Sequence, residues 1–400
     1  MTQPTSLLDS VLVVDLTRVL AGPFCTMMLG DLGAEVIKIE EPKRGDDTRG
    51  WGPPFTPGGE SAYFLSANRN KRSLTLNLKD PQGLEIVRRL TSSADVLVEN
   101  FRAGTMETWG LDYEALQKLR PGLIVCSITG FGQDGPYRDR PGYDFMVQAM
   151  GGFMSVTGPE DGEPYRAGIA IADLAAGMFA ASAILAALFA RERTGAGQRI
   201  DISLLDSQVA MLSYVASNYL ITGERPRRYG NGHPNIVPYQ AFAASDGFFA
   251  FAAGNDGQWK RFCQSVGKGE WAEDPRFATN GGRVQNRAPL VALLNELFSS
   301  RPGRDWMELC QSIGVPAAPI NPIDQVFEDP QVVARGMRQE AAHASEGSVP
   351  LVGSPLCIPT APVRMRRAPP TLGQHTDEIL AERLGCTPDQ ISAWRQTGVV

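Results

Sequence analysis

Short apolar runs alternate with helical stretches along the first third of the chain, and this alternation limits the fold more than any other feature. Four largely apolar runs have the character of strands buried in a parallel sheet: 11–15, 35–40, 95–98 and 123–127. The alternation favours an α/β fold with a doubly wound parallel sheet. Such folds bind ligands at the carboxyl ends of their strands, so we expect a site in the loops that follow these runs.

The segment 172–190 carries the strongest helix signal, because Ala and Leu dominate it and charged residues are nearly absent. A helix that is apolar on all sides is expected to be buried. Arg, Pro and Gly gather at 223–230, which indicates a linker. We therefore predict a large α/β domain over 1–224, a small α+β domain over 225–325, and a return segment over 326–400 that completes the large domain.

The overall charge narrows the class of partner. The 400 residues include 38 Lys and Arg against 44 Asp and Glu, a formal net charge of −6. This balance argues against nucleic acid as the main partner, since phosphate neutralisation needs concentrated basic charge. Uninterrupted apolar runs stay too short for a membrane span, and the first residues lack the pattern of a signal peptide. We expect a cytoplasmic protein without a membrane partner.

Residues that bind metals are scattered. The six cysteines form no Cys-x-x-Cys pair, and the three histidines are equally far apart in the sequence. The ligand spacing typical of zinc sites is missing, so we predict no metal site.

Asp173 is the first candidate for chemistry, because it stands where the apolar helix is expected to begin. There it could cap the helix by accepting a bond from a free backbone N–H group. It could also be a nucleophile, since an ionised carboxylate in a dry pocket can attack acyl carbons. Small neighbours such as Ala172 and Gly177 would let a bulky substrate approach. The residues alone leave both interpretations open.

Tyr143 and Asp144 mark a second expected helix start. Asp144 could cap that helix, and Tyr143 could donate a hydrogen bond to a carbonyl or carboxylate of a substrate. The segment 254–258 follows an apolar strand and is either a plain turn or a lid. Basic side chains also gather near the strand ends, where guanidinium groups suit phosphates: Lys43, Arg44, Arg49, Arg69, Lys71, Arg72 and Arg102.

Seven stretches, taken together and in order, resemble the family III CoA-transferases. They cover nearly the whole chain, and the ordered set is more specific than any single member: 14–23, 29–40, 70–73, 98–102, 142–144, the segment around Asp173, and 373–376. The resemblance implies that the large domain binds CoA and that two subunits form an interlocked homodimer. It also implies that Asp173 is the nucleophile.

In the implied reaction Asp173 attacks an acyl-CoA thioester, and CoA is then held as an aspartyl thioester before it passes to a small carboxylic acid. No cofactor is implied, because the substrate brings its own thiol. The resemblance places substrate contacts at Tyr143, Asp144, Gly254 and Gly257. It places CoA contacts at Val19, Lys43, Arg44, Arg69, Lys71, Arg72, Asn100, Phe101 and Arg102.

Details of the sequence bear on the substrate. Leu20 stands where formyl-CoA transferase has glutamine, which argues against an oxalate or formate specialist, whereas 236–242 resembles members that use succinyl-CoA and dicarboxylic acids. Four arginines are candidates for binding a distal carboxylate: Arg18, Arg138, Arg140 and Arg166. One alternative is an α-methylacyl-CoA racemase, although Tyr143 is a poor acid/base in place of histidine. The other is a noncatalytic CoA-binding protein in which Asp173 only caps its helix.

Overall fold

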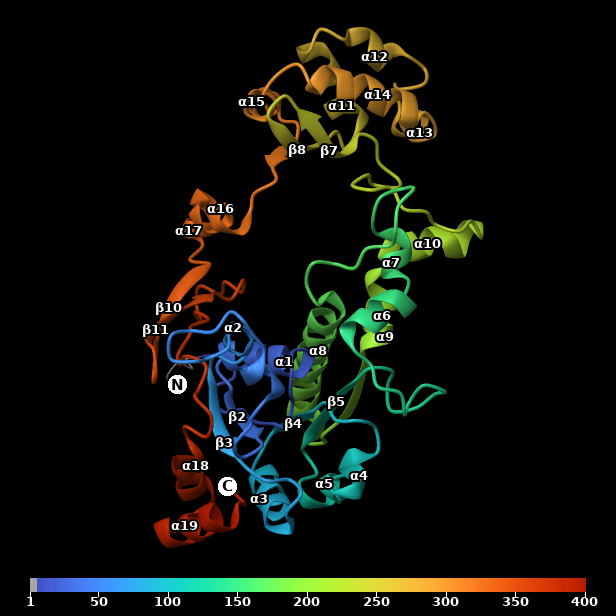
Figure 1. Cartoon of the computed structure of the whole chain (residues 1–400). Helices are drawn as coiled ribbons and strands as arrows, with labels where there is room; N and C mark the ends of the chain where they lie inside the picture. Colours follow the sequence, from blue (N-terminus) through green and yellow to red (C-terminus); the bar gives the residue numbers. More distant parts are fainter. Residues whose placement is uncertain (1–5) are drawn as a thin grey trace. The chain divides into compact units, whose positions relative to one another are not determined.

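The computed structural model describes residues 6–400 and divides into two compact units (Figure 1). The larger unit comprises 1–151, 168–211 and 330–400, and the smaller comprises 152–167 and 212–329. These limits differ from the predicted segments, because 152–167 and 212–224 belong to the smaller unit. The composition changes at 223–230, whereas the chain enters the smaller unit within apolar helical sequence.

A six-stranded parallel sheet forms the centre of the larger unit, in the order β3-β2-β1-β4-β5-β6. The four predicted runs all form strands of this sheet. Their neighbours β3 and β6 lie at its two edges. The strand bounds are β1 (Leu12–Asp15), β2 (Glu35–Glu40), β3 (Lys71–Thr75), β4 (Val96–Glu99), β5 (Ile124–Thr129) and β6 (Arg199–Ser203).

Two apolar cores cover opposite faces of this sheet, because successive side chains of a strand point to opposite sides. Val13 and Val36 pack with the helices α1 (Ala21–Asp31) and α8 (Ile171–Thr194). Leu12 and Ile37 pack with α3 (Pro81–Thr91), α5 (Tyr113–Leu119) and α18 (Thr376–Leu384). Helices on both faces make the larger unit a doubly wound α/β structure.

The remaining helices of the larger unit lie mainly in its loops and its C-terminal segment. The last segment also contains an antiparallel hairpin, β10 (Arg338–His343) with β11 (Gly347–Val352), which the sequence analysis did not predict. The other helices are the 3-10 helix η1 (Asp47–Gly50), α2 (Ala62–Ser66), α4 (Thr105–Thr108), α6 (Asp144–Met150), α9 (Leu204–Met211), α17 (Pro330–Ala334) and α19 (Pro388–Thr397).

The helix α8 confirms the predicted apolar helix at 172–190 and crosses α1 closely at Gly177. A Cβ atom at Gly177 would stand 2.6 Å from the carbonyl oxygen of Ala21, so the crossing requires glycine. By length and composition α8 is the one helix of the described residues that could cross a membrane. Half of its most apolar window is buried inside the chain, and it packs in the core beside the sheet.

The smaller unit is built on a three-stranded antiparallel sheet, β7 (Tyr239–Ala244), β8 (Gly247–Ala252) and β9 (Ala317–Pro319). The predicted hairpin around Asp246 and Gly247 is confirmed. An aromatic core lies between the sheet and its helices. The helices are α7 (Phe153–Val156), α10 (Ser213–Thr222), α11 (Asp256–Ser265), α12 (Gly269–Glu273), α13 (Asn280–Gln285), α14 (Arg287–Phe298), α15 (Gly303–Ser312) and α16 (Ile323–Glu328).

Candidate functional site

A cavity of about 480 Å³ opens in the larger unit where β1, β4 and β5 end. Seven of the side chains predicted for the site line it together, although they come from distant parts of the sequence: Val19, Asn100, Phe101, Arg102, Tyr143, Asp144 and Asp173. The position agrees with the rule that open α/β sheets bind ligands beyond the carboxyl ends of their strands.

Asp173 is the third residue of α8 and does not cap the helix. The N-cap position is Ala170, whose side chain accepts no hydrogen bond. The carboxylate of Asp144 performs that function instead, because its Oδ1 accepts the backbone N–H of Ala172 at 2.9 Å and that of Asp173 at 3.4 Å. Within residues 6–400 the Asp173 carboxylate takes part in no hydrogen bond or ion pair of its own.

The surroundings of Asp173 favour its neutral form. Burial, together with the negative charge of Asp144, raises the pKa of Asp173 to about 7. A carboxyl group with a pKa near neutrality is both ionised in useful amounts and more basic than an ordinary aspartate. Strongly shifted pKa values in a cavity are characteristic of functional groups.

A contact between two glycines places Tyr143 and Asp144 at the cavity. Gly130 follows β5, and Gly142 precedes Tyr143; a Cβ atom on either glycine would stand 2.4 Å from the other's Cα atom. Only glycine allows this approach, which brings the start of α6 to the end of the sheet. Tyr143 remains exposed, with 69% of its surface accessible.

Val19 lines the cavity in a left-handed backbone conformation, with φ of 71°, which is unfavourable for a β-branched residue. Its N–H is held by the carboxylate of Asp46 at 3.2 Å. Arg18, the residue before Val19, is bound through both of its backbone polar groups. The side chain of Asn100 accepts the Arg18 N–H and donates to the Arg18 carbonyl oxygen. The amide of Asn100 is therefore engaged in shaping the loop that Val19 occupies.

A buried ion pair stabilises the loop that contains Val19. The ammonium group of Lys38, on β2, lies 2.9 Å from the Asp46 carboxylate and also donates to the carbonyl oxygen of Thr17. Both side chains of the pair are fully buried. The pair thus connects the sheet to the loop beside Asp173.

Several of the predicted CoA ligands lie outside this cavity, and their role in CoA binding stays a prediction. Lys71 is fully buried and pairs with Asp15 at 3.0 Å, and Arg69 pairs with Asp31. Arg72 contacts Glu35, Glu378 and Glu382 and is 6% exposed. These three basic residues lie just before and at the start of the edge strand β3, where each forms an ion pair with at least one carboxylate of the chain. Lys43 and Arg44 are exposed on the loop after β2.

A second cavity of about 360 Å³ adjoins the first, since Arg18, Phe101 and Arg102 line both. It extends past the ends of β1, β2 and β3 to Lys79 and Trp109. The two cavities together form an elongated space with arginines at its middle.

Two aromatic residues near Asp173 were not predicted from the sequence. Trp51 lines the cavity and forms an edge-to-face pair with Tyr63, whose ring centroid is 5.1 Å away. Burial, with the charges of Asp173 and Asp144 next in importance, raises the pKa of Tyr63 to about 12, so its phenol keeps its proton. Both lie in the loop 41–72, whose unusual length and lack of apolar periodicity were the available signal.

Gly254 and Gly257 belong to the smaller unit, at the start of α11. The N–H of Gly254 donates to the side chain of Gln258, and Asn255 caps the helix. Their predicted role as a lid stays a prediction.

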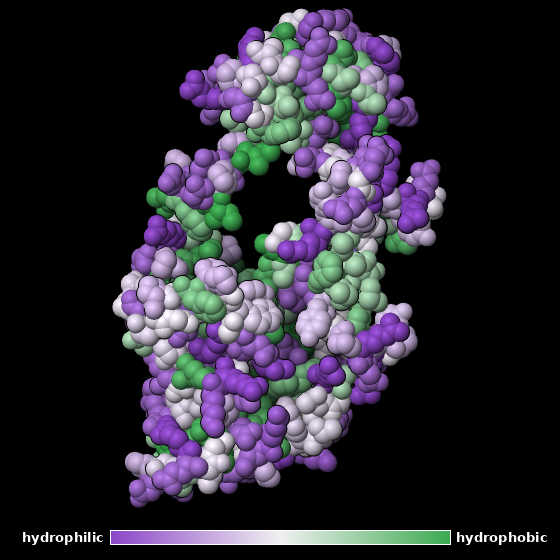
Figure 2. Space-filling model, viewed as in Figure 1, coloured by the Kyte–Doolittle hydropathy of each residue, from purple (hydrophilic) through white to green (hydrophobic). Residues whose placement is uncertain are grey.

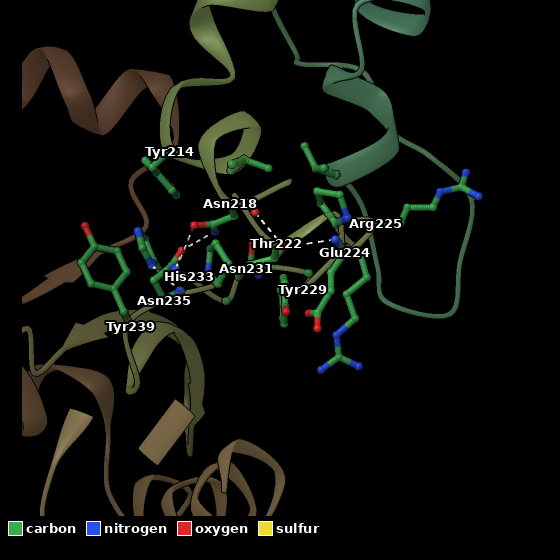
Figure 3. Close-up of a pocket in the computed structure, with 17 residues that line it drawn as sticks. Tyr214, Asn218, Thr222, Glu224, Arg225, Tyr229, Asn231, His233, Asn235 and Tyr239 are labelled. Atoms are coloured by element: carbon green, nitrogen blue, oxygen red, sulfur yellow. Dashed lines mark hydrogen bonds between the residues drawn. The ribbon is translucent and has the colours of Figure 1, made fainter. Parts of the chain in front are cut away.

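The smaller unit contains a cavity of its own, of about 660 Å³, shown in Figure 3. The ring of His233 stacks on Tyr214 at 5.0 Å, and Asn218 and Asn235 are hydrogen-bonded to each other. None of the side chains predicted for catalysis or CoA binding lines it. Across the described residues, no group of His, Cys, Asp and Glu is arranged to hold a metal ion.

The chain belongs to CoA-transferase family III, because residues 8–376 match the model of that family. A succinate–glutarate CoA-transferase from Agrobacterium fabrum is 48% identical, over 94% of this chain and 95% of its own length. The human succinyl-CoA:glutarate CoA-transferase is 46% identical, over 98% of this chain and 90% of the relative. This protein is accordingly a CoA-transferase by family.

Solved structures agree with this assignment. A CAIB/BAIF family protein from Brucella suis is 47% identical and superimposes with a TM-score of 0.83, covering 96% of this chain and all of that one. A hypothetical protein from Mycobacterium tuberculosis, at 31% identity, also has a TM-score of 0.83 and covers 94% of this chain and 99% of its own.

Proposed function

We propose that this protein transfers CoA from succinyl-CoA to a small dicarboxylic acid, with glutarate as the first acceptor to test. The observation that carries the proposal is the state of Asp173: a carboxylate that lines the cavity, is free of hydrogen bonds within the described residues, and has a pKa raised to about 7. Relatives at 46–48% identity that are named for succinate or succinyl-CoA and glutarate support this donor and acceptor.

The proposed reaction proceeds through covalent intermediates on Asp173. Its carboxylate attacks the thioester carbonyl of succinyl-CoA, which gives a mixed anhydride and CoA thiolate. The thiolate attacks the aspartyl carbonyl, so that an aspartyl-CoA thioester forms and succinate leaves. The acceptor carboxylate then attacks this thioester, and the released thiolate finally takes the acyl group of the new anhydride and frees Asp173.

The elongated space formed by the two adjoining cavities suits a CoA thioester. The thioester end lies at Asp173, Tyr143 and Trp51 in this arrangement, and the phosphates and adenine extend toward Lys79 and Trp109. Arg102 lines both cavities and offers a cation to the phosphates. The neutral phenol of Tyr63 and the hydroxyl of Tyr143 are candidates to donate hydrogen bonds to the oxyanions that form during acyl transfer.

The distal carboxylate of a dicarboxylic acid needs a cation on the same wall. Arg18 is paired with Asp47, and Arg138 lies 4.0 Å from Glu107. The guanidinium group of Arg140 instead stacks on Tyr137 at 3.8 Å, without a carboxylate partner among residues 6–400. Arg140 is therefore our first choice for binding the distal carboxylate.

We also propose that two chains form the interlocked homodimer that the family resemblance implies. Large apolar side chains are exposed along α6, α8 and α9 of the larger unit, where Figure 2 shows green and pale-green atoms. Examples are Phe145, Phe179 and Phe189, at 49%, 42% and 67% exposure. An apolar surface of this kind is typical of an interface between subunits. Light scattering after size exclusion tests it, and a monomer at micromolar concentration would contradict it.

Intact-protein mass spectrometry tests the reaction. Protein incubated with succinyl-CoA alone and quenched with acid should carry a CoA adduct on the peptide that contains Asp173. Addition of glutarate should remove the adduct and produce glutaryl-CoA. The Asp173→Asn variant is the matched control, because it preserves size and removes the nucleophile. Turnover by that variant, or the absence of any adduct in the unmodified protein, would refute the proposal.

A further inference from the structure

Three hydrogen-bond donors converge on the carboxylate of Asp144. Its Oδ1 accepts the backbone N–H groups of Ala172 and Asp173, and its Oδ2 accepts the side-chain amide of Gln148 at 2.6 Å. Gln148 lies one turn further along α6 and is fully buried. Asp144 is thus fixed from both sides, with one end of its carboxylate on α6 and the other on α8.

These contacts provide hydrogen-bond acceptors for backbone N–H groups at the start of α8. The first N–H groups of a helix need acceptors from outside the helix, and the N-cap residue Ala170 has none in its side chain. An acidic side chain in the first turn of a helix is attracted to such free N–H groups by the positive end of the helix. Asp173 lies in this first turn, but the N–H groups of Ala172 and Asp173 are already taken by Asp144.

On the basis of the proposed function, we propose that Asp144 is a positioning residue for the nucleophile. Its carboxylate binds the N–H groups at the start of α8, so that Asp173 does not cap its own helix and its carboxylate faces the cavity. Asp144 itself does not touch the reacting atoms in this role. The substrate contact that the sequence resemblance implied for Asp144 is replaced by this helix contact.

The electrostatics of the cavity are consistent with this role. The Asp144 charge is one of the two causes that raise the pKa of Asp173, and the other is burial. A carboxylate that accepts backbone N–H groups shifts in the opposite direction, toward a low pKa and weak basicity. Other titratable or charged groups around the pair are Tyr63 on α2 and, on the cavity wall, Arg18, Asp47, Arg102, Arg138 and Arg140.

The test measures the first half-reaction, formation of the enzyme–CoA adduct from succinyl-CoA, between pH 5 and 9. In the unmodified protein the rate should rise with pH around a midpoint near 7. Asp144→Asn keeps an oxygen that can accept the helix N–H groups but removes the charge. Its midpoint should fall by about one unit and its plateau rate by about tenfold. Asp144→Glu restores the charge and should return the midpoint toward 7.

Two further variants separate positioning from a general loss of structure. Asp144→Ala removes both acceptor and charge, so its plateau rate should fall below that of Asp144→Asn while the KM for succinyl-CoA stays within about twofold. Asp47→Asn is the control, because it removes a carboxylate that lines the same cavity and is paired with Arg18. Among residues 6–400 this carboxylate forms no hydrogen bond or ion pair with α8. Its midpoint should stay within about 0.3 unit of the unmodified protein.

The outcomes distinguish this inference from the proposed function. If the unmodified protein forms the adduct and Asp144→Ala keeps both midpoint and plateau, the inference is overturned and the function stands. If no adduct forms, the function is overturned, and carbodiimide labelling of Asp173 against pH, located by peptide mass spectrometry, still decides the inference. That labelling midpoint should be lower in Asp144→Ala than in the unmodified protein, and equal midpoints would overturn the inference.

Discussion

Replacing Asp173, the proposed nucleophile, should stabilise the protein, and the effect should grow with pH. The folded structure raises the pKa of Asp173 from 3.8 to about 7. The folded state therefore binds this proton more tightly than the unfolded chain, and ionising the buried group opposes folding as pH rises between these two values. Asp173→Asn removes the ionisable group and with it this pH-dependent cost.

The size of the effect follows from the shift. A difference of about three pKa units corresponds to about 4 kcal/mol at pH 8, as an upper value for a partly buried group. At pH 4 the same relation leaves about 0.6 kcal/mol, because the unfolded chain then also binds a substantial part of the proton. For a chain of this size we expect Asp173→Asn to raise Tm by about 5 °C at pH 8 and by about 1 °C or less at pH 4.

Differential scanning calorimetry at fixed protein concentration, from pH 4 to 8, measures this dependence. Asp389→Asn is the matched control, since Asp389 also lies in the first turn of a helix, α19, but is exposed. Its Tm should change by about 1 °C or less at every pH. A difference between Asp173→Asn and the unmodified protein that does not vary with pH would refute the argument from burial and charge.

Three further predictions rest on other contacts of the site. The kcat/KM for succinyl-CoA should rise with pH through about 7, as Asp173 loses its proton, and a flat profile between pH 6 and 8 would contradict this. Lys38→Met should destabilise the protein by about 3–5 kcal/mol in urea unfolding, because it leaves the Asp46 carboxylate buried without its partner, and adding Asp46→Asn should recover part of the loss. Gly177→Ala should lower both Tm and the adduct rate, since its methyl group would meet the Ala21 carbonyl oxygen and push α8 away from α1; unchanged values of both would show that the crossing tolerates a side chain.

Local sequence patterns predicted the buried strands and the apolar helix. Buried parallel strands are apolar runs, and α8 is an apolar helix, so both can be recognised without knowing their neighbours. The hairpin β10–β11 is different, because its strand 338–343 contains Arg, Gln, Glu and His, and only Ala341 and His343 are buried. The hairpin packs against Leu65, nearly 280 residues away in the sequence. No local signal reports such a contact.

The sequence predicted which residues form the candidate site better than it predicted what each residue does there. The resemblance selected seven side chains that the fold brings to one cavity. It also selected Lys71 and Arg72, which the fold places in ion pairs with carboxylates of the same chain. A basic residue looks the same in the sequence whether it faces a phosphate or such a carboxylate. The role of Asp144 depends on a bond to Ala172, 28 residues further on, which only the folded chain reveals.

Asp15, the last residue of β1, and Asp173 of α8 show why the environment of an aspartate, and not its residue type, supports a role as nucleophile. Asp15 is fully buried, yet its pKa is lowered despite the opposing effect of burial, because Lys71, Lys38 and two threonine hydroxyls surround its carboxylate. Asp173 lies beside another carboxylate instead of an ammonium group, and its pKa is raised. An aspartate held by four favourable partners has little tendency to form a new bond with an acyl carbon. Asp173, which has no hydrogen-bond or ion-pair partner for its carboxylate among residues 6–400, retains that tendency.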